Sequence, residues 1–107
     1  MATARQTQAQ ARLDAFLVAL RAEITGLRAA LTERQQLAER YRATAVNNAG
    51  EIERIARVSY DAGERGILEL LDAYRTGSSA RIRQAALDLA EREVELELEY
   101  VSGMEVQ

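Results

Sequence analysis

The stretch Tyr60-Asp61-Ala62-Gly63-Glu64-Arg65-Gly66-Ile67 decides the fold, because its two glycines stand three residues apart between two long helical patterns. Glycine tolerates the left-handed backbone that ends many helices, and a second glycine permits the tight turn that follows. We therefore predict an all-α fold, one long antiparallel helical hairpin with a coiled-coil-like contact. The expected bounds are a helix over about 4–61, a turn at 62–66 and a helix over about 67–102, forming a single unit over 1–107.

The first helix is predicted from an alternation of four- and three-residue steps that starts at Leu13 and ends at Ser59. Eleven of its fourteen positions are apolar, which is typical of a long helix in a coiled-coil-like contact. The segment 46–50 contains two asparagines and a glycine and could end the helix. Because the alternation keeps its register there, we expect a continuous helix. The fourteen seam positions are Leu13, Leu17, Leu20, Ile24, Leu27, Leu31, Arg34, Ala38, Tyr41, Ala45, Asn48, Ile52, Ile55 and Ser59.

The second helix carries two apolar stripes on nearly opposite sides, which predicts neighbours on both flanks, as in a helical bundle or barrel. A two-helix chain of this size leaves apolar surface uncovered, so we expect a homo-oligomer. The first stripe consists of Leu68, Leu71, Ile82, Ala85, Leu89 and Leu96, and the second of Leu87, Ala90, Val94, Leu98 and Val101.

Three local features bear on the bounds of the second helix. Thr76-Gly77-Ser78-Ser79 could be a C-cap followed by an N-cap and so divide it. The strict alternation from Val94 to Val101 imitates a strand, but no second strand exists to pair with it, so helix is favoured. Ser102-Gly103 is the expected end of the helix.

The composition narrows the function classes. The 107 residues include no Pro, Cys, His or Trp, and the fourteen basic residues, all Arg, alternate with seventeen acidic ones to give a net charge of −3. Such a surface offers no basic face for nucleic acid. Without His or Cys, the usual general base, thiolate and zinc ligands are missing, so we expect no enzyme, no cofactor and no metal. The apolar run Phe16 to Leu20 is interrupted by Arg21, so we expect neither a signal peptide nor a membrane span.

Around the turn, three motifs follow one another at fixed distances. They are Tyr60-x-x-Gly63-x-Arg65, then Ile67-Leu68-Glu69-Leu70-Leu71-Asp72-Ala73-x-Arg75-Thr76, and then Tyr100-x-x-Gly103. In these motifs the chain resembles the TolC family of outer-membrane efflux proteins, including its heavy-metal efflux branch, in the second of the family's two internal repeats. The resemblance covers about Ile24 to Gly103, weakly before Tyr60 and well after it.

The resemblance implies a helical hairpin of the α-barrel that carries exported substrates across the periplasm, on the periplasmic side of the outer membrane. Gly63, Glu64, Arg65, Gly66 and Ile67 would form the tip that docks on the periplasmic adaptor of a tripartite pump. Tyr60 and Arg65 would act as an entrance latch, and Glu69 and Asp72 as an acidic constriction. Carboxylates one helical turn apart share a face, so an oligomer would gather them around a pore.

Each of these residues also has an ordinary structural explanation. Tyr60 is suited to a helix end, Arg65 to the C-terminal end of a helix dipole, and Glu69 and Asp72 to a first helical turn. We also expect the chain to depart from the family, with one hairpin rather than two and with neither membrane strands nor a signal sequence. A soluble, self-associating coiled-coil scaffold unrelated to transport, or a small regulatory helical protein, is therefore the alternative. By itself such a chain would stay soluble in the cytoplasm. The exported substrate and the stoichiometry stay open.

Overall fold

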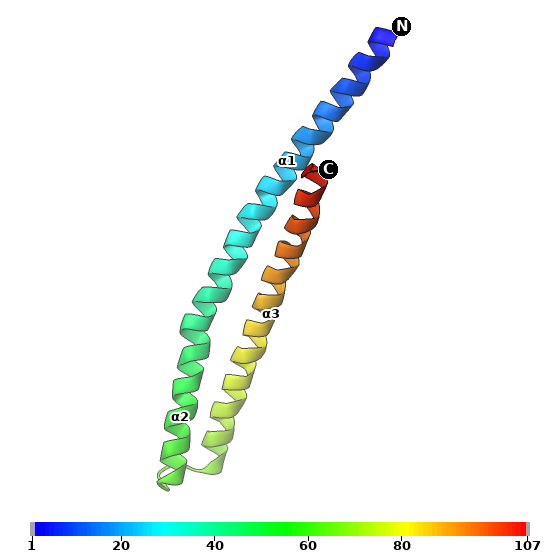
Figure 1. The fold of residues 1–107 in the computed structure, drawn as a ribbon. Coiled ribbons are helices and arrows are strands. Elements are labelled where there is room, and N and C mark those ends of the chain that lie inside the picture. The colour runs from blue at the N-terminus through cyan, green and yellow to red at the C-terminus, as the bar shows by residue number, and fades with distance from the viewer. Residues whose placement is uncertain (1, 107) are drawn as a thin grey trace. The chain divides into compact units, whose positions relative to one another are not determined.

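The computed structural model describes residues 2–106, and these are helical except for one turn (Figure 1). In chain order the elements are α1 (Ala2–Tyr41), the π-helix η1 (Arg42–Val46), α2 (Asn47–Asp61) and α3 (Ile67–Val106). The described residues contain no strand, which confirms the prediction of an all-α helical hairpin. The contacts divide the chain into two units, the first being Met1–Thr32 with Arg92–Gln107 and the second Glu33–Glu91.

The turn of the hairpin belongs to the second unit and occupies residues 62–66, as the two glycines predict. Gly63 has a φ of 76° and is the left-handed residue that ends α2. The Glu64 amide donates to the Ser59 carbonyl at 2.8 Å and the Gly63 amide to the Tyr60 carbonyl at 3.0 Å, which are the two bonds of a Schellman motif. The carbonyl of Gly66 then accepts the Leu70 amide at 3.4 Å and opens α3.

Two glycines of this unit should respond oppositely to alanine. Gly63→Ala places a Cβ on a left-handed backbone, which costs roughly 1–2 kcal/mol of unfolding free energy. Gly50 lies inside α2 with nothing within 4 Å of an added Cβ, so Gly50→Ala should raise that free energy by about 1 kcal/mol. Urea denaturation of both variants measures the two changes, and the same sign for both would contradict the turn as described.

Small residues dominate the contact between the helices of the second unit. On α3 the buried positions follow alternating steps of three and four residues and include Ala73, Gly77 and Ala80. The buried residues that face them from the other arm are Ala38, Ala49 and Ala56. One buried cluster joins Ala56 with Leu70 and Ala73, and Tyr74 packs against it. Such residues leave little apolar area to bury, so this contact depends on closely fitted backbones.

The predicted seam is correct in its register as far as Ala45 and wrong from Asn48 to Ile55. Ala38 is buried and Tyr41 and Ala45 are half-buried, but Asn48, Ile52 and Ile55 are exposed. The residues one position further on, Ala49 and Ala56 with the half-buried Glu53, take their place. The strict alternation of four and three averages about 3.5 residues per turn, whereas the buried Leu20, Ala38 and Ala56 recur at the roughly 3.6 residues per turn of an α-helix, so the alternation drifts off the buried face. Arg34, also predicted in the seam, is exposed.

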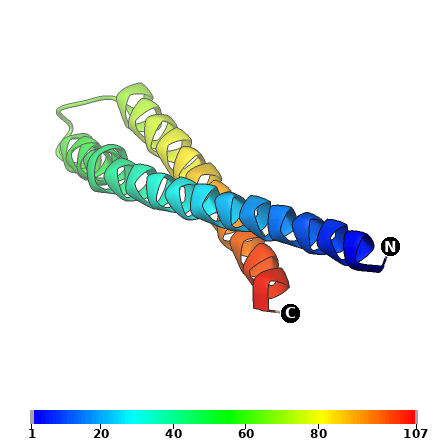
Figure 2. The ribbon, with the colours of Figure 1, turned by 90° about the horizontal axis from the view of Figure 1, so that it is seen from above.

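The first unit, in contrast, packs large apolar side chains. Leu20 and Ile24 of α1 are buried against Val101 of α3, and Leu27 and Leu98 pack against the same cluster. The N-terminal turns of α1 continue past the end of α3 (Figures 1 and 2). Leu13 and Phe16 therefore lie on the apolar stripe of α1 but stay about half exposed.

α3 is one unbroken helix, so three expectations about it can be decided. The alternative break at Thr76–Ser79 does not occur, because Gly77 is a buried contact residue rather than a helix end. The alternating stretch from Val94 to Val101 is helical, as expected. The predicted end at Ser102-Gly103 is wrong, because the helix continues to Val106.

Of the two stripes on α3, the second faces the hairpin contact and the first does not. Leu87 and Val101 of the second stripe are buried. In the first stripe Leu68 is 78% and Ile82 71% exposed, and Leu71, Leu89 and Leu96 are also exposed. α3 thus carries an apolar face that the described residues leave uncovered.

Candidate functional site

The residues assigned to the tip lie at the closed end of the second unit. Gly63, Glu64, Arg65 and Gly66 form the connection between α2 and α3, and Ile67 opens α3. All five are exposed. The Schellman bonds fix the path of this connection, so the tip presents a defined backbone rather than a loose loop.

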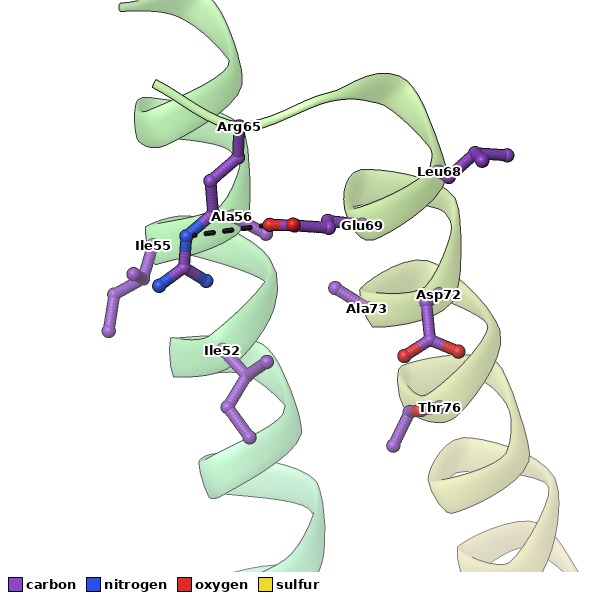
Figure 3. A pocket seen from close by; sticks show the side chains of 9 residues that line it. All are labelled: Ile52, Ile55, Ala56, Arg65, Leu68, Glu69, Asp72, Ala73 and Thr76. Atoms are coloured by element: carbon purple, nitrogen blue, oxygen red, sulfur yellow. Dashed lines mark ion pairs between the residues drawn. The ribbon is translucent and has the colours of Figure 1, made fainter.

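A groove of about 730 Å³ begins beside the tip, between α2 and α3 (Figure 3). Its apolar walls include Ile52 and Ile55 of α2, and Leu68 of α3 lies at its margin, pointing away from α2. Its full lining is Ile52, Ile55, Ala56, Arg65, Leu68, Glu69, Asp72, Ala73 and Thr76. A second hollow of about 320 Å³ shares Ile52 and Thr76 with it, so the two adjoin along the same arms.

The sequence does not predict this groove, because the seam places Ile52 and Ile55 inside the helix–helix contact. They line the groove because the contact runs through Ala49, Glu53 and Ala56 instead. The sequence assigns Arg65 to the tip and latch, and Glu69 and Asp72 to the constriction. The structure brings these three charged residues together along the groove.

Arg65 and Glu69 form an ion pair across the mouth of the groove, with 3.6 Å between Arg65 Nε and Glu69 Oε2 (Figure 3). The two side chains are 55% and 62% exposed, so the pair contributes little to stability. Tyr60, the other residue assigned to the latch, is 41% exposed, and its hydroxyl has no hydrogen-bond partner among the described residues. The structure therefore does not join Tyr60 to Arg65 within one chain.

Glu69 and Asp72 lie one turn apart on α3 and line the same groove. Glu69 points toward Arg65, which partly neutralises it. Asp72 has no ion-pair partner among residues 2–106, so it is the carboxylate that remains available to a partner. The groove thus combines apolar walls with one free negative charge.

Away from the groove, an ion pair links the two arms above a glycine. Arg81 Nη2 of α3 lies 2.8 Å from Glu53 Oε1 of α2, and the Glu53 side chain is only 15% exposed. The Glu53 carboxylate lies over Gly77, whose missing side chain provides the space. Glu53 and Arg81 stand 28 residues apart in the chain, and no local pattern in the sequence pairs them.

Replacing Gly77 should remove the Glu53–Arg81 ion pair while leaving the stability of the fold nearly unchanged. A Cβ at position 77 would overlap the Glu53 carboxylate, so Gly77→Ala should displace Glu53 from Arg81. The lost pair costs about 0.2–1 kcal/mol, whereas alanine in a helix gains about 1 kcal/mol over glycine. We expect the unfolding free energy to change by about 0.5 kcal/mol or less. A double-mutant cycle between Glu53 and Arg81 should give a coupling energy in the parent that vanishes in the Gly77→Ala background, and an unchanged coupling would contradict this geometry.

A polar cluster connects α3 with α1 and η1. Buried Gln84 donates from Nε2 to the Ala38 carbonyl at 3.1 Å and to Asp88 Oδ1 at 2.9 Å. The same Asp88 oxygen accepts a hydrogen bond from Arg42 Nη2 at 2.9 Å. The other amide atom, Gln84 Oε1, is buried without a partner. We name Ala38, Arg42, Gln84 and Asp88 the Gln84 cluster.

Two further hydrogen bonds shift the pKa values of exposed residues on α2. A hydrogen bond from Arg54, together with its positive charge, lowers the pKa of Glu51. A hydrogen bond to the Tyr74 hydroxyl raises the pKa of the Arg57 guanidinium, with 3.2 Å between Arg57 Nη1 and the hydroxyl oxygen. Because Glu51 and Arg57 are fully exposed, they make no poised acid or base.

Within residues 2–106 no group of three or more acidic side chains is placed to hold a metal ion. Over the same range, no helix combines the length and apolar character that crossing a bilayer requires. No protein-family model, no curated protein and no solved structure matches this chain. A function for the chain therefore has to rest on its own residues.

Proposed function

We propose that the chain is a non-catalytic helical hairpin of the kind that builds the periplasmic α-barrel of a TolC-type export duct, with its tip docking on a periplasmic adaptor protein. The observation that carries the proposal is the turn. The motif Tyr60-x-x-Gly63-x-Arg65 coincides with the closed end of a helical hairpin, and the Ile67 to Thr76 motif lines a groove beside it.

The exposed stripe of α3 supports the side-by-side association that such a barrel requires. Ile82, Leu89 and Leu96 recur every seven residues on a face that the hairpin itself leaves uncovered. Sustained heptad spacing of this kind favours helix-to-helix packing with another chain. The inner stripe then holds the hairpin together, and the outer stripe holds copies together.

Binding to the adaptor's helical hairpin, measured by calorimetry or by surface plasmon resonance, tests the docking role. Replacing Gly63, Arg65 and Gly66 together should weaken binding strongly. That triple variant also loses the left-handed glycine, so Arg65→Ala is measured alongside it. The Arg65→Ala hairpin should keep its full helix content. Arg83→Ala is the matched control, an exposed arginine of α3 outside the groove. Equal affinity of the parent and both tip variants would refute the tip assignment.

The second candidate is a soluble, self-associating coiled-coil scaffold without a role in transport. The uncovered stripe of α3 favours it as well, because a second copy of the chain suffices to cover that stripe. Both functions require self-association, but only the duct requires the adaptor. Self-association with no adaptor binding would therefore select the scaffold.

A further inference from the structure

Charge is distributed unevenly along α3, which is one unbroken helix. The stretch from Ala73 to Leu87 carries three arginines and no acidic residue. The stretch from Asp88 to Glu99 carries six acidic residues and one arginine. The helix is therefore basic in the first stretch and acidic in the second, and the exposed stripe of Ile82, Leu89 and Leu96 crosses the boundary between them.

We infer that the exposed stripe of α3 binds the same stripe of a second copy, with the two α3 helices antiparallel and Leu89 at the centre of the contact. One patch then serves both copies, as in a dimer with two-fold symmetry. This inference deepens the self-association proposed above and rests on it, but it does not depend on adaptor docking.

The apolar residues of the stripe are spaced symmetrically about Leu89. Ile82 and Leu96 each lie seven residues from it, on the same side of the helix, and they are 71% and 48% exposed. In an antiparallel pair Ile82 of one copy therefore meets Leu96 of the other, and Leu89 meets its own counterpart. Ala85 and Ala86 are exposed beside Leu89, and their small side chains allow the two helices to approach closely.

The charges along one edge of the stripe favour the antiparallel orientation. Arg83 lies six residues before Leu89, whereas Glu93 and Glu97 lie four and eight residues after it. An antiparallel pair thus brings Arg83 of one copy between Glu93 and Glu97 of the other, and the symmetry repeats this contact. All three side chains are exposed, and none of them has an ion-pair partner among residues 2–106. The pair would therefore use charges that one chain leaves unpaired.

The charges along the other edge are complementary in the same orientation. Arg81 lies eight residues before Leu89, and Glu95 and Glu99 lie six and ten residues after it. These three already have partners within the chain, so this edge adds less. A parallel pair would instead set acidic stretch beside acidic stretch and basic beside basic, which is unfavourable across an interface.

The antiparallel pair has a consequence for the proposed duct. Because the tip immediately precedes the first residue of α3, the two tips of the pair point in opposite directions. In the proposed duct all tips dock at one end, so its copies are parallel. Pair and barrel would cover the same stripe and exclude each other. The purified chain should therefore form the pair, and a barrel could assemble only after the pair opens.

Cross-linking between single-cysteine variants tests the orientation, since the chain contains no cysteine of its own. Ser79 and Tyr100 are exposed on one edge of the stripe, ten residues before and eleven after Leu89. The antiparallel pair brings Ser79 of one copy to Tyr100 of the other and keeps like positions roughly 30 Å apart. A mixture of Ser79→Cys and Tyr100→Cys chains should form the mixed disulfide at least about tenfold faster than either variant links to itself.

Charge reversal gives an independent readout in sedimentation equilibrium. Arg83→Glu should weaken the pair about five- to thirtyfold, because the symmetry places the new repulsion at two contacts. Adding Glu97→Arg to the same chain should return the affinity to within about threefold of the parent, because opposite charges then face each other again. Arg28→Glu is the control, an exposed arginine of α1, and should change the affinity by less than about twofold. Circular dichroism checks that every variant keeps its full helix content.

The outcomes separate this inference from the proposed function. A mixed disulfide that forms no faster than the self-linked products would overturn the antiparallel pair. An affinity that Arg83→Glu leaves unchanged, or that Glu97→Arg fails to restore, would overturn it as well. A monomeric parent chain would overturn both the pair and the proposed self-association, whereas a loss of adaptor binding alone would contradict only the duct.

Discussion

Replacing Ile24 by alanine should lower the free energy of unfolding by about 3 kcal/mol. Ile24 is 3% exposed and lies in the cluster that α1 forms with α3 in the first unit, together with Leu20 and Val101. This cluster holds the large buried aliphatic side chains of its unit, so few neighbours can move in to fill the space. The lost apolar burial and the cavity should therefore both appear in the measured value.

Leu13→Ala is the matched control for this substitution. Leu13 lies on the same apolar stripe of α1 but is 50% exposed, beyond the part of the helix that α3 covers. Alanine also has the higher helix propensity, so the change in unfolding free energy should stay within about 0.5 kcal/mol. Both variants are compared by urea denaturation at one protein concentration. Equal losses at the two positions would show that α3 does not cover Ile24.

Ala38→Leu should destabilise the chain by about 2 kcal/mol for the opposite reason, because the site has no room. Ala38 is 1% exposed, and its carbonyl receives the Gln84 amide at 3.1 Å. A leucine there must displace Gln84 or separate the arms. Either response disturbs the Gln84 cluster, so the loss of stability should be accompanied by loss of the Arg42–Asp88 ion pair.

Ala29→Leu provides the comparison for Ala38→Leu, since it makes the same chemical change on an exposed face of α1. Its effect on unfolding free energy should be within about 0.5 kcal/mol. The two substitutions are measured by thermal and urea denaturation. If Ala38→Leu were as mild as Ala29→Leu, the close approach of the helices at Ala38 would be wrong.

The hairpin and its turn could be predicted from the sequence because their causes are local. Gly63 supplies the left-handed residue of the Schellman motif, and no neighbour in space is needed to require it. The unbroken α3 across Gly77 was harder to predict, because the same glycine suits a helix end and a close contact. Only the arm that packs over it decides between the two.

The register beyond Ala45 departs from the predicted seam, because a strict alternation of four and three has a slightly shorter period than the α-helix. The apolar alternation continues through Asn48, Ile52 and Ile55, so the pattern by itself predicts these three residues in the contact. Gln84 and Asp88 each lie 46 residues after the partner that they bind at the entrance to η1, and nothing in the pattern links them to it. The tip residues lie together because they are contiguous, but the apolar wall of the groove is a consequence of the register shift.

The central claim is that the chain is a structural hairpin whose uncovered α3 stripe binds further copies, and sedimentation equilibrium tests it most directly. The purified chain should have a mass above that of the monomer at micromolar concentration, and its melting temperature should rise with concentration. Replacing the exposed Ile82 and Leu89 by serine together should return it to a helical monomer. A parent chain that is monomeric at high micromolar concentration, with a melting temperature independent of concentration, would contradict the claim.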